Sequence, residues 1–296
     1  MAGMKEIKNK IEGIQETQKI TSAMYLIAST KLRKAREHLD QTMPYFEALK
    51  NEIAVMFSNI ETVKSRYFLP EGVAEDEDTQ IDGRHAWLVI TADKALAGEY
   101  NQRVIRRAEN LLSQHEDNAL FVVGENGRAY FSSHGYQIEK SFLYSAQNPD
   151  MNRARDICEH LIDQYNDGTF SKIYLVYTDF GGGVNPQCVV KRLLPLHRAF
   201  FDEIPGTSEN DYEFIPSADE VLDNIIPNFL IGYVYSALVD SYCSEQNARM
   251  VAMDNANRNA GEMLDQLRLQ YNHARQGTIT QEITEVVSGA RAMRRK

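Results

Sequence analysis

Few residues in this chain have the type and spacing that chemistry requires. The three cysteines, Cys158, Cys188 and Cys243, lie far apart, and no CxxC pair or paired histidines complete a zinc site. The seven histidines and the many carboxylates show no spacing typical of a nucleophile with its base. The sequence therefore predicts no catalytic, cofactor-binding or metal-binding residue. We expect the cysteines to be small buried hydrophobes in a reducing compartment.

Phosphate-binding glycine patterns are also missing. Neither GxGxxG nor GxxxxGK(S/T) occurs, and the segment TADKALAGEYNQ that follows the first expected strand holds only Gly98. The glycine-rich stretch DFGGGVN at residues 179–185 leads into an expected strand, which favours a flexible turn over a phosphate cradle. We therefore expect no direct nucleotide binding.

Length and charge bound the remaining classes. With 296 residues the chain can form one large or two ordinary domains, and its net charge of −10 argues against general affinity for nucleic acid. No apolar run approaches the roughly 18 residues of a membrane span, and the N-terminal residues lack the apolar core of a signal peptide. These observations predict a soluble or peripheral intracellular protein.

The charge is unevenly distributed along the chain. Residues 1–40 hold eight Lys/Arg and five Asp/Glu, and residues 241–296 hold eight and six, so that the ends carry +3 and +2. The middle then carries −15. Because the two ends share a character that the middle lacks, we expect them to form one element, with a separate domain inserted between them.

The N-terminal segment has a sustained heptad pattern, which predicts a coiled-coil helix over residues 1–60. Polar residues interrupt the apolar seam at Gln18 and Thr21, and Pro44 is expected to bend the helix. The seam consists of Ile7, Ile11, Ile14, Gln18, Thr21, Tyr25, Ala28, Leu32, Ala35 and Leu39.

The C-terminal segment, residues 217–296, reads as one helix, since nothing after Pro227 forbids a helix of nearly 70 residues. At about 1.5 Å per residue it would run roughly 100 Å. Four alanines at every fourth position would let a partner helix approach closely. An ordinary helical hairpin in a globular core is the alternative, although it needs no helices of such unequal length. The alanines are Ala248, Ala252, Ala256 and Ala260, and the apolar stripe continues through Met263, Leu267, Tyr271, Ala274, Ile279, Ile283, Val286, Ala290 and Met293.

The middle, residues 61–216, reads as an α/β domain. Continuous apolar runs at 86–91, 119–124 and 172–178 predict strands buried on both faces, with a further strand at 187–196. Helical stretches at 102–113 and 152–165 between them predict a small Rossmann-like parallel sheet. The acidic stretch at 71–80 is expected to be a solvated connection.

Two segments carry a family resemblance. KEIKNKIEGIQETQKITSAMYLIASTKLRKARE, residues 5–37, and SEQNARMVAMDNANRNAGEMLDQLRLQYNHARQGTITQEITEVVSGA, residues 244–290, resemble the terminal signatures of the gamma subunits of F-type ATP synthases. The middle is similar more loosely, through TADKALAGEYN, VVGENGRAYF and LLPL. In the turn after Asp93, Lys94 and Ala95 stand where the family usually has arginine and glycine, and Glu99 stands in place of a usual glycine.

This resemblance implies a mechanical role. The terminal helices would pair as an antiparallel coiled coil and enter the cavity formed by three alpha and three beta subunits. The α/β domain would bind the epsilon subunit and the ring of c subunits. The chain would turn as protons pass and would touch the membrane only through that ring, at the cytoplasmic face of a bacterial plasma membrane. It would perform no covalent chemistry and hold no cofactor.

The resemblance also answers a question that the sequence raises near its end. Weak helix formers gather in ARQGTITQEITEVVSG, residues 274–289, at the tip of a long helix. In the family, positions matching Arg275, Gln276 and Thr280 face a moving loop of the beta subunit. The alternative from a different class is an α/β enzyme or ligand-binding domain with a dimerising coiled coil, which predicts a ligand at the carboxyl edge of the sheet.

Overall fold

The computed structural model describes residues 2–60, 64–69, 83–115, 117–183, 186–202 and 214–293. The chain divides into two compact units. The coiled-coil unit comprises Met1–Ser29 and Arg249–Lys296, and the α/β unit comprises Thr30–Ala248. The acidic stretch at 71–80 lies outside the described residues.

Two long helices contribute to both units. α1 spans Ala2–Ser58 and continues through Pro44, while α6 spans Ala218–Met293 and contains Pro227. Each proline removes one backbone hydrogen bond. The packing of the surrounding turns is enough to keep each helix continuous across its proline.

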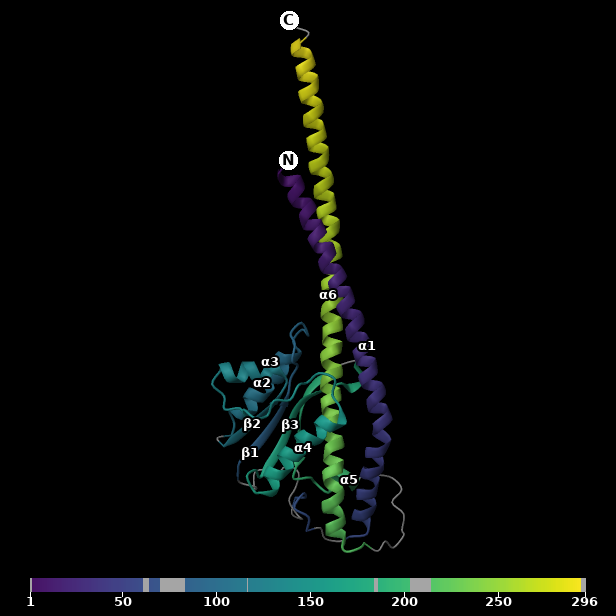
Figure 1. The fold of residues 1–296 in the computed structure, drawn as a ribbon, viewed down its shortest axis with the longest axis vertical. Helices are drawn as coiled ribbons and strands as arrows, with labels where there is room; N and C mark the ends of the chain where they lie inside the picture. The colour runs from purple at the N-terminus through teal and green to yellow at the C-terminus, as the bar shows by residue number, and fades with distance from the viewer. Residues whose placement is uncertain are drawn as a thin grey trace. The chain divides into compact units, whose positions relative to one another are not determined.

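The sheet of the α/β unit has four strands in the order β2-β1-β3-β4 (Figure 1). β1 (His85–Ile90) pairs in parallel with β2 (Asn118–Val123) and with β3 (Lys172–Asp179), and every residue of β1 is buried. β4 (Gln187–Leu194) pairs with β3 in antiparallel orientation. The predicted α/β fold is confirmed, with one antiparallel edge strand. That edge follows from the short DFGGGVN connection, because parallel strands need a much longer crossover.

Helices cover both faces of this sheet (Figure 1). On one face lie α2 (Tyr100–Leu112) and α3 (Glu125–Ser133), with Val104, Ile105 and Phe131 in the core. The helices predicted at 102–113 and 152–165 are confirmed as α2 and α4, whereas α3 was not predicted. α3 begins directly after Gly124, whose φ of 95° suits glycine and whose missing Cβ would lie 2.3 Å from the Thr91 carbonyl oxygen.

The other face carries the main core of the α/β unit. α4 (Met151–Asn166) and the parts of α1 and α6 that belong to this unit pack there against the strands. The short elements η2 (Gly181–Gly183) and α5 (Ala199–Asp202) complete the unit. The buried residues of α1 and α6 in this core include Leu39, Phe46, Ile53, Phe57, Leu222, Ile226, Leu230, Val234 and Leu238.

The composition of α6 differs from the expectation that no segment could span a membrane. By length and mean hydropathy, 1.2 over 18 residues, α6 passes the criteria for a span. Of that window, 56% is buried inside the structure. Core residues such as Leu222, Leu230 and Val234 are fully buried. The apolar stretch therefore forms a core helix of the α/β unit. A core helix and a membrane-spanning helix can have the same apolar composition.

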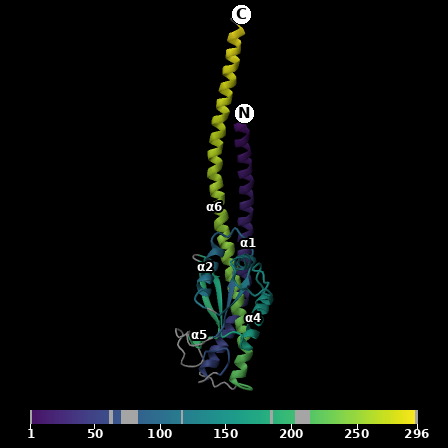
Figure 2. The ribbon, with the colours of Figure 1, turned by 90° about the vertical axis from the view of Figure 1, so that its left-hand side faces the viewer.

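In the coiled-coil unit, α1 and α6 lie side by side and run antiparallel (Figures 1 and 2). Thr21 Oγ1 donates to Asn257 Oδ1, and Gln18 Nε2 donates to the Asn257 carbonyl oxygen at 3.4 Å. The helices are antiparallel, so residues are paired by counting toward the N-terminus in α1 from Thr21 and toward the C-terminus in α6 from Asn257. This count places apolar residues of the two helices at the same height. The pairs are Ile14 with Leu264, Ile11 with Leu267, Ile7 with Tyr271, and Met4 with Ala274, all of them buried or half-buried.

The same count shows where the pairing stops. Residue 2 of α1 is level with about residue 276 of α6, given the equal rise of two helices. Thr278 is half-buried, and every residue of α6 from 279 to 291 is exposed. α6 thus continues beyond the pairing as a single exposed helix, called here the α6 tip (residues 275–293).

Candidate functional site

The α6 tip stays helical although many of its residues are weak helix formers. Its threonines direct their hydroxyl groups to the backbone one turn earlier. Thr280 Oγ1 donates to the Gln276 carbonyl oxygen at 2.9 Å, and Thr284 Oγ1 donates to that of Thr280 at 2.8 Å. Thr278 does the same with Ala274 at 3.1 Å. The hydroxyl groups of these threonines are therefore hydrogen-bonded within α6 itself, without a contact to another protein.

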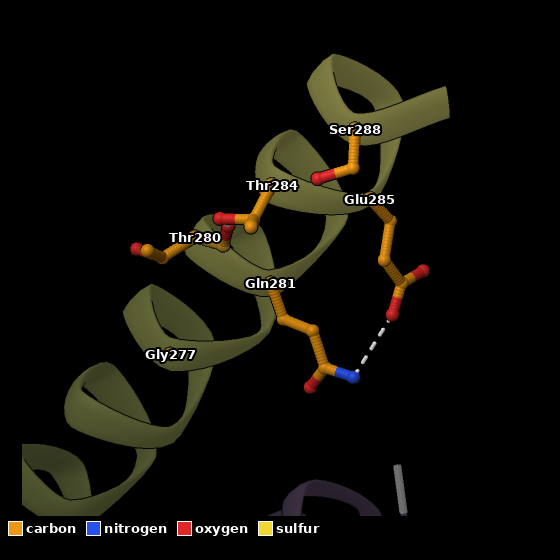
Figure 3. Close-up of a pocket in the computed structure, with 6 residues that line it drawn as sticks. All are labelled: Gly277, Thr280, Gln281, Thr284, Glu285 and Ser288. Carbon is orange, nitrogen blue, oxygen red and sulfur yellow. Dashed lines mark hydrogen bonds between the residues drawn. The ribbon is translucent and has the colours of Figure 1, made fainter. Parts of the chain in front are cut away.

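One side of the tip is small and polar. Gly277 has no atom within 4 Å of the place where a Cβ would stand, and it lies in a shallow, open hollow on the helix surface (Figure 3). At its rim, Gln281 Nε2 donates to Glu285 Oε1 at 3.0 Å. One helix alone forms the walls, so the hollow is an open surface depression and not an enclosed ligand pocket. Its lining residues are Gly277, Thr280, Gln281, Thr284, Glu285 and Ser288.

The opposite side of the tip is apolar. At about 100° per residue, Ile279, Ile283 and Val286 form a stripe on the helix face away from Gly277. Their exposed fractions are 46%, 59% and 72%. An apolar stripe this exposed is typical of a surface that another protein covers.

Among the predicted contact residues, the structure brings together Gln276 and Thr280, through the hydrogen bond described above. Arg275, Gln276 and Thr280 are all exposed. Arg275 has its planar guanidinium available to an outside carboxylate, and Thr280 lies on the rim of the hollow. The three residues sit where the pairing of α6 with α1 ends.

The predicted seam residues of α1 all lie on the less exposed side of that helix. Ala28 is 1% exposed, and Ile11, Ile14, Thr21 and Leu32 are half-buried. Leu32 packs against the core of the α/β unit. The heptad spacing of α1 thus identifies the face that the structure turns away from solvent.

The alanine row of α6 has a more varied environment. Ala260 is 8% exposed, Ala252 and Ala256 are half-buried, and Ala248 packs against Ala92, Ala97 and Tyr100 in the α/β unit. A spacing of four residues drifts by about 40° per step around a helix, so such a row winds away from a straight seam. The buried line of α6 in the coiled-coil unit follows alternating steps of three and four through Met253, Asn257, Ala260, Leu264, Leu267, Tyr271, Ala274 and Thr278.

At this point the alternative function can be tested at the carboxyl edge of the sheet, where it places a ligand. α6 occupies this edge at the end of β3. Ser241 Oγ accepts the Thr178 N–H at 3.2 Å, and Ser244 Oγ donates to the Thr178 carbonyl oxygen at 3.4 Å. Both serines are 1% exposed. The end of β3 therefore faces the protein's own helix.

The turn after β1 is occupied in the same way. Asp93 Oδ1 accepts the Glu125 N–H at 2.9 Å, and Asp93 Oδ2 accepts the Ala146 N–H at 3.1 Å and the Ser145 hydroxyl. The Asp93 carboxylate is thus an internal tie between β1, the start of α3 and the loop before α4. No group of three or more metal-ligating side chains occurs among the residues that the structure describes.

The cysteines have the character of apolar core residues. Cys158 and Cys243 are buried and Cys188 is half-buried, and all three are free thiols. Burial raises the pKa of Cys243 to about 12 and that of Cys188 to about 11, and it raises the pKa of Cys158 as well. The reactive thiolate form is therefore disfavoured at neutral pH.

Comparison with known proteins agrees with the geometry over the whole chain. A family model described as ATP synthase matches residues 3–293. The ATP synthase gamma chain of Ruminiclostridium cellulolyticum is 40% identical over 297 residues, which are 98% of each chain. That of Caldanaerobacter subterraneus subsp. tengcongensis is 40% identical over 97% of this chain and 99% of its own. The chain belongs to the ATP synthase gamma chain family.

The fold of this gamma chain is also found in a solved assembly. A chain in the cryo-EM structure of the Euglena gracilis mitochondrial ATP synthase, OSCP/F1/c-ring, rotational state 3, matches with a TM-score of 0.67. The match covers 99% of this chain and 95% of that one at 16% identity, so it shows the shared fold. The sequence resemblance is confirmed, and the function is that of an ATP synthase gamma chain. An α/β enzyme with a dimerising coiled coil is not supported.

Proposed function

We propose that this gamma chain is the non-catalytic central stalk of an F-type ATP synthase, turning inside three alpha and three beta subunits. Its α/β unit binds the epsilon subunit and the c ring, through which alone it meets the membrane. Proton flow through the membrane sector turns the stalk at the cytoplasmic face of a bacterial plasma membrane. The observation that carries this proposal is the α6 tip, exposed on every face from residue 279 to 291.

A rotating tip must meet three equivalent partners in turn without adhering to one. The hollow around Gly277, which is lined by glycine, threonine, serine, glutamine and glutamate, and the stripe of large aliphatic residues through Ile283 give the tip two faces of different residue type. Rotation therefore presents a different chemistry to each beta subunit at any moment, which is what an asymmetric shaft requires. The carboxyl edge of the sheet supports the non-catalytic role, because Ser241 and Ser244 of α6 cover the end of β3 there.

The contact residues are Arg275, Gln276 and Thr280. Arg275 offers a planar fork to a carboxylate of the beta subunit, and lysine would keep the charge but lose the fork. Gln276→Leu would leave a polar loop of the partner without a hydrogen-bond partner, at a cost of about 1 to 3 kcal/mol. We expect Arg275→Lys and Gln276→Leu each to lower multisite ATP hydrolysis and proton pumping at least about fivefold, the rate factor that about 1 kcal/mol implies.

The experiment uses the assembled enzyme in membranes. Hydrolysis and pumping are compared with the nucleotide affinity of a single catalytic site, which should not change because the tip touches no substrate. Arg268→Lys and Gln270→Leu are matched controls, since both residues are exposed on α6 before the tip begins. Full hydrolysis and pumping in both Arg275→Lys and Gln276→Leu would show that the tip does not carry the contact.

A further inference from the structure

The hydrogen bonds that close the edge of the sheet also join the long helix to it. Ser241 and Ser244 lie three residues apart, on one face of α6. Ser241 accepts from the N–H of Thr178 and Ser244 donates to the carbonyl oxygen of the same residue. The backbone N–H and the carbonyl oxygen of Thr178, at the end of β3, are therefore both hydrogen-bonded to α6. Ser241, Ser244 and Thr178 are called here the α6–β3 clamp.

The three residues of the clamp are buried. Thr178 is 6% exposed, and it pairs with Cys188 of β4 in the sheet register. Tyr100, at the start of α2, is 6% exposed, and its hydroxyl lies near Ser241. Burial raises the pKa of Tyr100, so the hydroxyl keeps its proton. Four elements, α2, α6, β3 and β4, thus meet at this point.

A second contact follows one turn later along α6. Ala248 packs against Ala92, Ala97 and Tyr100, next to the end of β1. Tyr242, on a neighbouring face of α6, donates from its hydroxyl to Asn148 Oδ1 at 3.1 Å. Close apolar packing in the core holds α6 against the strands. The hydrogen bonds at 3.2 and 3.4 Å add a directional tie between α6 and one residue of β3.

We propose that the α6–β3 clamp is the joint through which torque passes between the α/β unit and the helix that carries the tip. This inference rests on the proposed function, since it assigns to named residues the transfer of rotation within the stalk. The two serines are positioning residues and touch no substrate. Removing both hydroxyl groups leaves α6 in place by its apolar packing but removes the directional tie between α6 and the end of β3.

The test compares Ser241→Ala, Ser244→Ala and the double variant in the assembled membrane enzyme. Ser241→Thr retains a hydroxyl group and serves as the conservative variant. Ser236→Ala is the matched control, because Ser236 is a half-buried serine of the same helix that does not contribute to the clamp. Two quantities are measured, namely amide hydrogen exchange of the peptide that contains Thr178, and ions pumped per ATP hydrolysed.

We expect the double variant to exchange the Thr178 amide about tenfold faster and to pump at most half as many ions per ATP, while hydrolysis continues. Ser241→Thr should recover both values and Ser236→Ala should match the parent. Faster exchange with an unchanged pumping ratio would show that the clamp is merely structural and would overturn the proposal. Unchanged exchange would overturn it too. If the double variant fails to assemble, the test uses the single variants, with the same two measurements of amide exchange and of ions pumped per ATP.

Failure of this inference differs from failure of the proposed function. The contact of the tip with the beta subunits is tested at Arg275 and Gln276 with the clamp intact. A normal pumping ratio in the clamp variants, together with loss of activity in the tip variants, would leave the stalk function standing and remove only the clamp as its joint.

Discussion

Asp240 illustrates how a single residue of the long helix can be sensitive to pH. It is half-buried on α6, and its pKa is raised to about 7 by burial and by the nearby Asp179 at the end of β3. Arg36 of α1, whose guanidinium lies 5.2 Å from the centre of the Phe180 ring, opposes that rise. Cys243 shares this environment and also faces Asp40. Groups from α1, α6 and β3 thus surround one carboxyl group.

The sign of the pH dependence follows from this raised pKa. In the unfolded chain an aspartate ionises near pH 4, whereas folded Asp240 ionises near 7. The free energy of unfolding therefore decreases as the pH rises from about 4 to 7, and the decrease is complete above pH 7. Asp240→Asn should stabilise the chain at pH 8 by about 2 to 4 kcal/mol and have little effect at pH 4.

Denaturant unfolding of the full chain at both pH values measures this difference. Asp254→Asn is the control, since Asp254 is exposed on the same helix. An Asp240→Asn variant that is no more stable than the parent at pH 8 would contradict the prediction. Sequence reasoning alone does not single out Asp240, because a lone aspartate within an apolar helix has the same sequence pattern whether it is solvated or enclosed. Only the neighbours contributed by α1 and β3 distinguish the two cases.

At the scale of elements, the packing of α1 on α6 in the α/β unit depends on one glycine. A Cβ on Gly232 would lie 2.0 Å from Cδ1 of Phe46, which is 9% exposed. Gly232→Ala should therefore force the Phe46 ring to move and destabilise the chain by about 1 to 3 kcal/mol. Gly261→Ala, on the same helix with nothing within 4 Å, should stabilise it by about 0.5 to 1 kcal/mol.

Thermal or denaturant unfolding of the two variants gives effects of opposite sign if the close approach of the helices is the cause. Equal effects would show that intrinsic helix propensity outweighs the contact. The contrast matters because both glycines lie within one helix and differ only in what stands opposite. A sequence pattern assigns them the same propensity and cannot separate them.

Elements were predictable where their pattern is local. The apolar runs identified β1, β2 and β3 to within one residue, because strands buried on both faces need continuous apolar residues. The heptad spacing of α1 identified its less exposed face. α3 escaped prediction, since it starts only because Gly124 lets the backbone approach Thr91. In α6, Met263 is 52% exposed and Leu264 is 4% exposed, so the buried line depends on the actual position of α1.

In the candidate site, too, some residues could be predicted from the sequence and others depend on contacts between distant segments. Arg275, Gln276 and Thr280 were reached through the family resemblance, and the structure adds that all three are exposed where pairing with α1 stops. The serines of the clamp were out of reach of sequence reasoning, because Ser241 and Ser244 become informative only when Thr178 is brought against them from more than 60 positions away.

For the molecule as a whole, the paired helices of the coiled-coil unit should turn as one body. Thr21 and Asn257 form a side-chain hydrogen bond across the seam, so cysteines at both positions would face each other and can be tested for a disulfide between α1 and α6. If α1 and α6 rotate together, oxidising Thr21→Cys/Asn257→Cys in the assembled enzyme should leave hydrolysis and pumping unchanged. Each single cysteine variant is the control for losing the polar contact. A loss of activity on oxidation that thiol reduction reverses would mean that α1 and α6 must slide or twist against each other during each turn, and that the shaft works as two helices moving on one another rather than as a single rod.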